Sequence, residues 1–228
     1  MGNQELATVT PTRFERRRAS TRARLVEAAE RLMRERGVEA VTIQDITDAA
    51  DLGHGTFYLH FKAKGDVLGP VIERLAAPLH EQVDRAAQGS NDPALRQALG
   101  LRILLRAIAD DPLWSWYARS GISFGRLSAD MGTQPVDDME YGLQSGRYDV
   151  SDLRTAIYFL DGALIGVISE LDDGRPVDEV AEAAAALMLR VLGINPSEAA
   201  AIAQVPLDMP AATTSEVVDF PSTPTPRD

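Results

Sequence analysis

The 228-residue chain contains no cysteine and only three histidines, His54, His60 and His80. The lack of cysteine excludes a disulfide framework, a thiolate metal site and a thiol nucleophile. Three scattered histidines are too few for a convincing zinc site. The length allows a sizeable core, built as one large domain or as a small domain plus a larger one.

Long apolar runs are also missing. No stretch of about 18 residues is free of polar or charged interruption, so we expect no transmembrane helix and no membrane partner. No apolar signal-peptide core precedes the first arginines. The sequence also lacks a nucleophile–base pair, a phosphate-binding loop, a ligand-spaced His/Glu set and a dinucleotide fingerprint. We therefore expect a cytoplasmic protein that is not an enzyme and uses no cofactor.

Basic charge is scarce and unevenly distributed. The formal net charge is −11, from 23 Lys and Arg against 34 Asp and Glu. Residues 1–65 carry 11 basic and 9 acidic side chains, whereas residues 66–228 carry 12 basic and 25 acidic. Six arginines fall between Arg13 and Arg24, against one acid, Glu15. A local basic patch attracts nucleic acid whatever the total charge, so this part of the chain is the candidate for DNA binding.

The segment 41–64, VTIQDITDAADLGHGTFYLHFKAK, predicts two short helices separated by a tight turn. Thr42 and Asp45 form a Thr-x-x-Asp start signal for the first helix, with Ile46 on its buried side. Asp51 falls in the turn and tolerates the left-handed backbone conformation better than most residues. The pattern is that of a helix-turn-helix.

The second helix of this segment should begin at about His54, after Gly53 as a weak N-cap. Phe57 and Phe61 are four positions apart and should both face inward. The remaining side chains then lie on the outer faces, where a recognition helix meets base edges with its N-terminal residues and phosphates with its flanks.

The outward side chains suit both tasks. His54 and Thr56 can donate or accept hydrogen bonds at a base edge. Gly55 lets the backbone approach DNA closely, and Leu59 offers apolar contact to a thymine methyl group. The residues expected on phosphates are Tyr58, His60, Lys62 and Lys64.

This segment resembles the DNA-binding region of the tetracycline-repressor (TetR) family of transcriptional regulators. The residues that carry the resemblance are Thr42, Ile46, Ala49, Ala50, Gly55, Thr56, Phe57, Tyr58, His60, Phe61 and Lys64, with Leu25, Ala28, Ala29, Leu32, Gly37 and Val38 upstream. The chain departs from the family pattern at Asp51, where glycine is usual. The resemblance implies an all-α fold, with an N-terminal helix-turn-helix domain followed by a larger helical ligand-binding and dimerisation domain. It also implies that Thr42 and Gln44 touch DNA.

Four segments are expected along the chain. They are a flexible basic arm (1–17), a helix-turn-helix domain (18–65), a helical effector-binding and dimerisation domain (66–205) and a disordered Pro-rich tail (206–228). Arg17 and Arg18 belong either to a solvated tail or to a phosphate or minor-groove contact. Gly37 should end the first helix. Further helices are predicted over about 65–87, 93–110, 112–129, 135–147, 151–172, 176–193 and 196–204.

The helices over 151–172 and 176–193 contain stretches that are apolar on nearly all faces, namely 156–160, 163–168 and 183–192, the last broken only by Arg190, and such stretches need burial on all sides. Gly162 and Gly166 would let another helix approach closely. In the TetR-like family the last two long helices pair with those of a second subunit, which implies a homodimer here; the alternative is that both form the monomer's core. The interface residues expected are Phe159, Gly162, Leu164, Gly166, Ile168, Leu187, Arg190 and Val191.

The middle of the larger domain is rich in aromatic residues and methionine, as apolar ligand pockets are. Plain core packing is the alternative for each of these side chains. Asp161 lies within an apolar helix and needs a partner, either an interface arginine such as Arg154 or Arg190 or a ligand donor. The pocket residues expected are Trp114, Tyr117, Phe124, Met139, Tyr141, Tyr158 and Asp161.

The sequence therefore predicts a sequence-specific DNA-binding regulator. Its expected partners are double-stranded DNA with a palindromic operator, a second copy of the chain and a small apolar or aromatic effector that releases a repressor from the operator. The alternative is a DNA-binding protein of the same fold without an effector.

Overall fold

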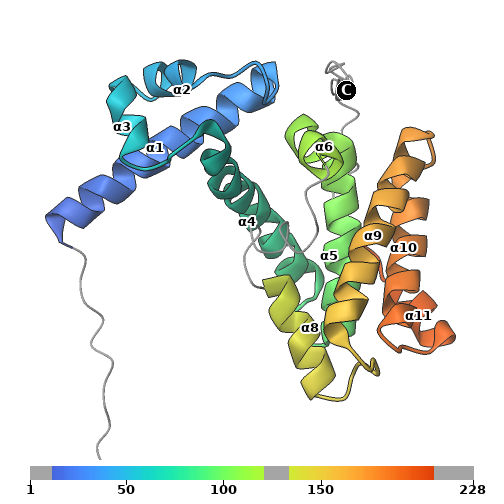
Figure 1. The fold of residues 1–228 in the computed structure, drawn as a ribbon. Coiled ribbons are helices and arrows are strands. Elements are labelled where there is room, and N and C mark those ends of the chain that lie inside the picture. Colours follow the sequence, from blue (N-terminus) through green and yellow to red (C-terminus); the bar gives the residue numbers. More distant parts are fainter. Residues whose placement is uncertain (1–11, 121–133, 208–228) are drawn as a thin grey trace, which may run out of the picture. The chain divides into compact units, whose positions relative to one another are not determined.

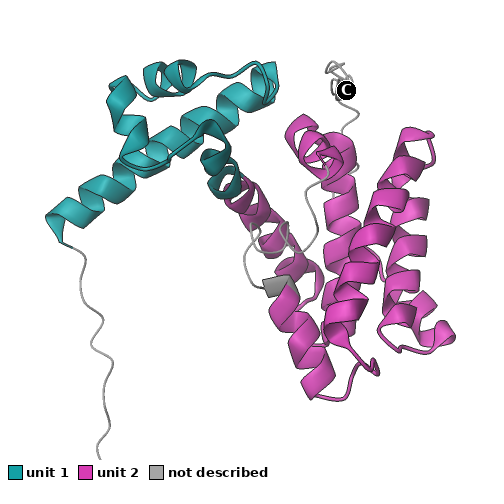
Figure 2. Cartoon of the chain, viewed as in Figure 1, with its two compact units in different colours: residues 1–71 teal, residues 72–228 magenta. Residues whose placement is uncertain are grey.

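The computed structural model describes residues 12–120 and 134–207, and in these ranges the chain forms helices and no β-strand (Figure 1). The expected all-α fold is confirmed. The chain divides into two compact units, residues 1–71 and residues 72–228 (Figure 2). The division falls within one helix, slightly later than the boundary predicted after residue 65. No helix of the described ranges is both long and apolar enough to span a membrane.

The smaller unit consists of α1 (Arg13–Arg36), α2 (Ile43–Ala49), α3 (His54–Tyr58), the 3-10 helix η1 (Lys64–Val67) and the first turn of α4 (Leu68–Ala86). The buried side of α1 packs against α2, and Gly37 ends α1 with a φ of 81°. The buried side chains of this unit include Leu25, Val26, Ala29, Leu32, Met33, Ile46, Phe57 and Phe61.

The helix α1 begins earlier than the sequence suggested. Thr12 and Glu15 form a capping box, in which the Glu15 amide donates to the Thr12 hydroxyl at 3.2 Å and the Thr12 amide to the Glu15 carboxylate at 2.7 Å. The reciprocal cap satisfies two backbone N–H groups that would otherwise lack partners and starts the helix at Arg13. The arm predicted over residues 1–17 therefore ends before Arg17 and Arg18, which are helical.

The larger unit consists of the rest of α4 and of α5 (Pro93–Asp110), α6 (Pro112–Arg119), α8 (Gln134–Gln144), α9 (Leu153–Asp172), α10 (Val177–Val191) and α11 (Pro196–Ala203). The central helix α5 packs against α6, α8, α10 and α11, and α9 packs mainly against α10. These helices match the predicted ranges closely, except that α6 ends at Arg119. The stretch predicted to continue it to residue 129 lies outside the described residues, as does the predicted tail from residue 208 onwards.

Arg147, in the connection between α8 and α9, ties this unit together at one end of α5. Its guanidinium donates to both carboxylate oxygens of Asp92, at 2.8 and 3.0 Å, and lies 2.7 Å from the Glu198 carboxylate of α11. Asp92 also caps α5 by accepting from the Ala94 amide. The hydrogen bonds from Arg147 hold the pKa of Asp92 below its usual value. Bidentate pairs of this kind fix geometry as well as charge.

Candidate nucleic-acid interface

The turn between α2 and α3 has the geometry that the sequence predicted. Thr42 caps α2 by accepting from the Asp45 amide at 3.1 Å, and Ile46 is fully buried. Asp51 adopts a left-handed φ of 51°, and the next amide, of Leu52, donates to the Thr47 carbonyl at 2.9 Å. The predicted left-handed conformation of Asp51 is confirmed.

Arg24 stabilises this turn, a role that sequence reasoning missed. Its guanidinium donates to the backbone carbonyl oxygens of Ala50 and Asp51. These carbonyls follow the end of α2, where cations are favourable. The Arg24 side chain is therefore engaged in hydrogen bonds within the protein, although the sequence does not distinguish it from the other five arginines between Arg13 and Arg24.

The helix α3 begins at His54 after Gly53, which makes no side-chain cap, as expected. Phe57 is fully buried and Phe61 is 5% exposed, with ring centroids 5.4 Å apart. Their burial fixes which face of the helix points outward. The exposed or half-exposed side chains are then the predicted DNA-reading set, His54, Gly55, Thr56, Tyr58, Leu59 and His60.

Positive charge surrounds the far end of this helix. The Arg22 guanidinium lies over the Phe61 ring, 5.2 Å from its centroid. The pKa of His60 is lowered by burial first, and then by the positive charges of Arg18 and Arg22. Arg17 and Arg18 are exposed on α1. This corner of the unit is therefore cationic and open to an anionic partner.

The two predicted lysines differ in their surroundings. The Lys64 ammonium donates to the backbone carbonyls of Val38 at 3.0 Å and Glu39 at 3.4 Å, in the connection after α1. Lys62 is exposed. The geometry thus favours a structural role for Lys64 and leaves Lys62 as the better phosphate contact.

The two residues assigned to DNA by family resemblance also have partners within α2. The Thr42 hydroxyl is engaged in the cap with Asp45. The Gln44 side-chain amide donates to Asp48 at 2.6 Å, but both residues remain exposed. Contact with DNA would require these side chains to exchange or share those hydrogen bonds.

The structure places the predicted pocket residues in different surroundings. Trp114 and Tyr117 of α6 are buried and pack edge to face, with centroids 6.4 Å apart, and Met139 of α8 is also buried. Tyr141 and Tyr158 are 53% and 58% exposed, and Asp161 is half-buried on α9. Phe124 lies outside the described residues. The exposure of Tyr141 and Tyr158 argues against a pocket-lining role within one chain.

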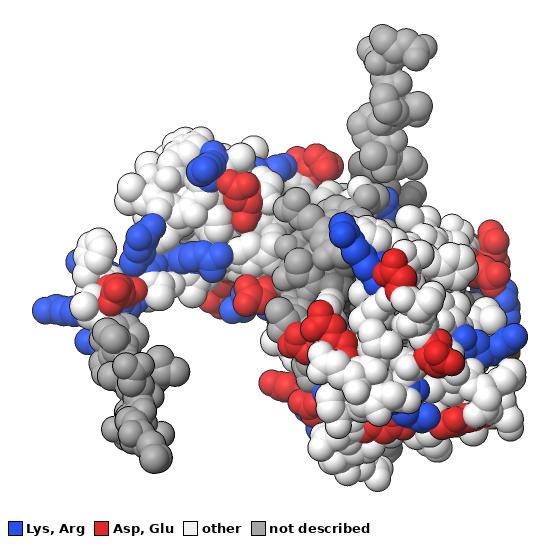
Figure 3. Space-filling model, turned by 60° about the horizontal axis from the view of Figure 1, so that its bottom comes forward, with Lys and Arg blue, Asp and Glu red and all other residues white. Residues whose placement is uncertain are grey.

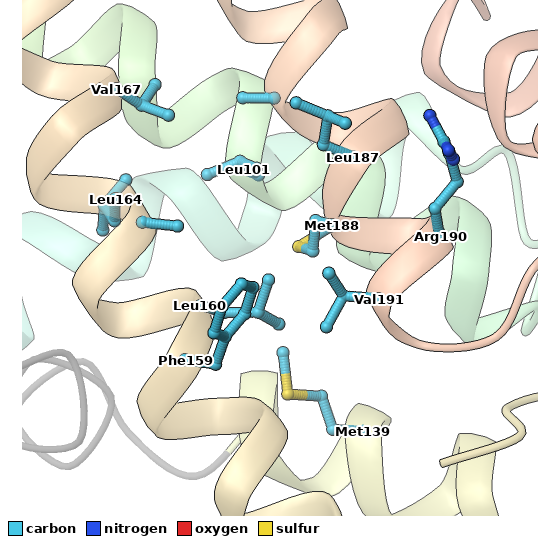
Figure 4. A pocket seen from close by; sticks show the side chains of 12 residues that line it. Leu101, Met139, Phe159, Leu160, Leu164, Val167, Leu187, Met188, Arg190 and Val191 are labelled. Atoms are coloured by element: carbon cyan, nitrogen blue, oxygen red, sulfur yellow. The ribbon is translucent and has the colours of Figure 1, made fainter.

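An apolar groove of about 510 Å³ runs between α9 and α10 (Figure 4). Phe159, Leu160 and Leu164 of α9 face Leu187, Met188 and Val191 of α10, and Met139 lies at one end. Arg190 lies at its edge and is exposed. Of the residues that line it, Phe159 and Leu187 are more than half exposed, whereas Met139, Leu164 and Met188 are buried.

The predicted interface residues divide into two groups along this surface. Phe159 is 62% exposed and Leu187 56% exposed, and a Cβ added at Gly162 or Gly166 would meet no atom of a neighbouring helix within 4 Å. Leu164 and Ile168, by contrast, are buried inside the monomer. These two side chains pack on their own chain, and their place in a dimer interface stays a prediction.

Charge is distributed differently over the two units. Figure 3 shows Lys and Arg side chains beside Asp and Glu side chains on both units, and the sequence gives residues 1–65 a small excess of basic side chains and residues 66–228 a large excess of acidic ones. Within the part of the chain that the structure describes, no cluster of His, Asp and Glu is suited to a metal ion.

Two family models match the chain. One is described as "Bacterial regulatory proteins, tetR family" and covers residues 25–69; the other, "Tetracyclin repressor-like, C-terminal domain", covers residues 92–205. The smaller and larger units thus each contain one matched region.

Relatives and solved structures agree with these models. The transcriptional regulator AcuR of Cereibacter sphaeroides is 30% identical over 70% of this chain and 68% of its own length. TtgR of Pseudomonas putida is 35% identical over 40% of this chain, a match that spans only 42% of TtgR. A crystal structure of RolR with its ligand resorcinol has a TM-score of 0.70 and 34% identity, covering 85% of this chain and 98% of RolR.

Proposed function

We propose that this chain, which belongs to the TetR family of bacterial regulatory proteins, is a dimeric transcriptional repressor that a small aromatic effector releases from its operator. The observation that carries DNA binding is the division of α3 into two faces. Phe57 of α3 and Phe61, which follows the helix, anchor the inner side, while His54, Thr56 and Tyr58 lie on the outer face. A protein of this kind binds and releases its ligands without converting them.

The outer face of α3 assigns different tasks to different residues. His54 and Thr56, near the start of the helix, are placed to read base edges in the major groove. Tyr58, His60 and Lys62 flank them and would hold phosphates, which fix register without reading sequence. We place this activity in the cytoplasm, together with the DNA.

The second part of the proposal is a homodimer formed through α9 and α10. The exposed apolar side chains Phe159, Ile165 and Leu187 form a surface that a monomer rarely leaves in water. Gly162 and Gly166 allow close approach of a second helix. Two reading helices related by a two-fold axis would then contact half-sites about 34–36 Å apart, or a multiple of that spacing.

The third part is the effector. RolR was crystallised with resorcinol, and its likeness extends over nearly the whole RolR chain. A small aromatic molecule suits a helical body in which Trp114 and Tyr117 already pack edge to face. The effector would act only through different affinities for the DNA-competent and DNA-incompetent states.

DNA binding is tested first by selecting bound fragments from a random DNA library and measuring fluorescence anisotropy with the selected site. His54→Ala and Thr56→Ala should each weaken the selected site by about 1–3 kcal/mol and random DNA much less. Arg85→Ala, a surface variant of the larger unit, serves as the matched control. Equal losses on both DNAs for His54→Ala and Thr56→Ala would contradict the placement of the reading helix.

Dimerisation and induction need separate measurements. Light scattering should give the mass of a dimer, and a monomer at micromolar concentration would contradict the α9–α10 interface. Resorcinol and related phenols are then titrated with and without the selected DNA. By linkage, DNA must weaken an inducing phenol by the same factor by which the phenol weakens DNA. A phenol that binds equally well to both forms is not an inducer.

A further inference from the structure

The first two turns of α1 bury no side chain. Leu25 is the first buried side chain of α1, and every residue from Arg13 to Ser20 is exposed. Figure 1 shows these turns running on past α3. A helical end without packing is marginal in water, yet the Thr12–Glu15 capping box keeps it helical. A surface held in this way has a defined shape for a partner.

One face of this end continues the face that packs on the core. Phe14, Arg17, Arg18 and Thr21 have the spacing i, i+3, i+4 and i+7, and Leu25 follows four positions later. The Thr21 hydroxyl is held by the Arg17 carbonyl at 3.0 Å. The same face that buries Leu25 therefore points, further along, toward α3.

The two helices enclose a groove of about 360 Å³, lined by Phe14, Arg17, Arg18, Thr21, Thr56, Leu59 and His60. Two large apolar side chains in its lining are mostly exposed, since Phe14 is 75% exposed and Leu59 is 71% exposed. Its lining is cationic, because it contains two arginines. A groove with this combination fits a ligand that is both anionic and apolar.

We propose that this groove holds one stretch of the DNA sugar–phosphate backbone beside the major groove read by α3. Arg17 and Arg18 bind a phosphate, and Phe14 packs against the adjoining deoxyribose. The inference rests on the proposed DNA-binding function. It adds Phe14 as a DNA contact, which a search for basic residues would miss because its side chain is uncharged. A bare phosphate has no apolar surface for Phe14 and Leu59, whereas a nucleotide backbone alternates phosphate and sugar. Phe14 is a positioning contact, because sugars carry no base sequence.

The test compares Phe14→Ala with Arg18→Ala in the full-length protein, on the selected site and on random DNA. Phe14→Ala should weaken both DNAs by a similar factor, roughly tenfold for a partly buried phenyl ring. The salt dependence of binding should not change, because no charge is lost. Arg18→Ala should weaken both DNAs and reduce the salt slope by about one. Phe14→Leu should keep most of the affinity.

Hydroxyl-radical footprinting gives a direct readout, because this reagent cleaves at deoxyribose. The wild-type protein should protect a sugar at the flank of each half-site, and Phe14→Ala should lose that protection while the rest of the footprint remains. Ser20→Ala, on another face of the same helical end, is the matched control. Alanine is a better helix former than phenylalanine or serine, so both alanine variants should preserve the helix.

The outcomes separate this inference from the proposed function. Failure of the wild-type protein to bind any selected DNA overturns the function itself. If the wild type binds and Phe14→Ala binds as well with an unchanged footprint, only the backbone groove is overturned. A loss confined to the selected site, together with reduced DNA bending, would instead show that Phe14 inserts between bases and would also overturn it.

Discussion

The guanidinium of Arg24 donates a hydrogen bond to the backbone carbonyl of Asp51, 3.2 Å away, and Asp51 has a φ of 51°. A helix-end cation thus holds a left-handed non-glycine residue in the turn of the reading unit. The carboxylate of Asp51 is fully exposed, 3.9 Å from the same arginine, and adds little to this contact. The turn depends on backbone conformation more than on the ion pair.

Substitutions at Asp51 should therefore act through the backbone. Asp51→Val should lower the free energy of unfolding by about 1–2 kcal/mol, because a branched side chain is disfavoured in the left-handed region. Asp51→Gly should stay within about 1 kcal/mol of wild type, because relief of strain is offset by the greater entropy of the unfolded chain. Urea denaturation measures both. Equal midpoints for the valine and glycine variants would show that the turn has no conformational strain.

The lysines at the end of the reading segment should separate stability from DNA binding. Lys62→Ala should reduce the slope of log affinity against log salt by about one and leave stability nearly unchanged. Lys64→Ala should cost about 1 kcal/mol of stability, because hydrogen bonds to the carbonyls of Val38 and Glu39 are lost.

Salt titrations and urea denaturation of the two variants make the comparison. Because Lys64 is engaged within the fold, its removal should leave the salt slope unchanged. The reverse pattern, with the slope lowered only by Lys64→Ala, would identify Lys64 as the phosphate contact instead.

Local signals made the reading unit predictable from the sequence. Thr42 with Asp45, the left-handed Asp51 and the Phe57–Phe61 pair are each decided within a few residues. The partners of Arg24 and Lys64 are 26 residues away in sequence, in each case a backbone carbonyl. No sequence pattern marks a carbonyl as an acceptor, so these two roles became visible only in the fold.

The larger unit shows the limit of composition as a guide. Its helices followed from the periodicity of apolar residues and from boundary signals in the sequence. The exposure of a given side chain could not be predicted in this way, because α9 is apolar on several faces and only packing decides which face is covered. Leu164 is buried while Ile165, the next residue, is 60% exposed. For the same reason Trp114 and Tyr158, both aromatic, lie in opposite environments.

The affinity for DNA should depend on pH through the protonation of His60. Burial and the charges of Arg18 and Arg22 lower its pKa below the ordinary 6.5 in the free protein. DNA phosphates near this corner would favour the imidazolium and raise that pKa in the complex. Binding would then take up a proton, so affinity should increase as the pH falls from above the pKa of the complex to below that of the free protein.

The control for this prediction is a pair of glutamine variants. His60→Gln should flatten the dependence of DNA affinity on pH in that window, and His80→Gln in the larger unit should leave it intact. Anisotropy titrations between pH 5 and 8 at constant ionic strength measure both. An unchanged pH profile in His60→Gln would place the titrating group elsewhere.

The charged residue beside the apolar groove between α9 and α10 leads to a prediction about the dimer. Arg190 lies at the edge of the apolar groove, near the C-terminal end of α10. Covering it with a second copy requires an acidic partner, because an unpaired buried charge is costly.

In a two-fold four-helix bundle, each α9 has its own α10 on one side and the partner's α10 on the other. Asp161 lies on the same stripe of α9 as Tyr158 and Ile165, beside Gly162. This position on the outer stripe of α9 lets its carboxylate meet Arg190 of the second copy. We expect the pair to form across the dimer interface, once on each side of the two-fold axis.

Charge reversal tests this pairing directly. Asp161→Arg and Arg190→Asp should each weaken the dimer, because each places like charges opposite one another at both symmetry-related positions, and the double variant should regain much of the loss. The dimer dissociation constant is measured by analytical ultracentrifugation, with Arg175→Asp as a surface control. Additive losses in the double variant, with a wild-type protein that is still dimeric, would rule out this pair but leave the interface in place.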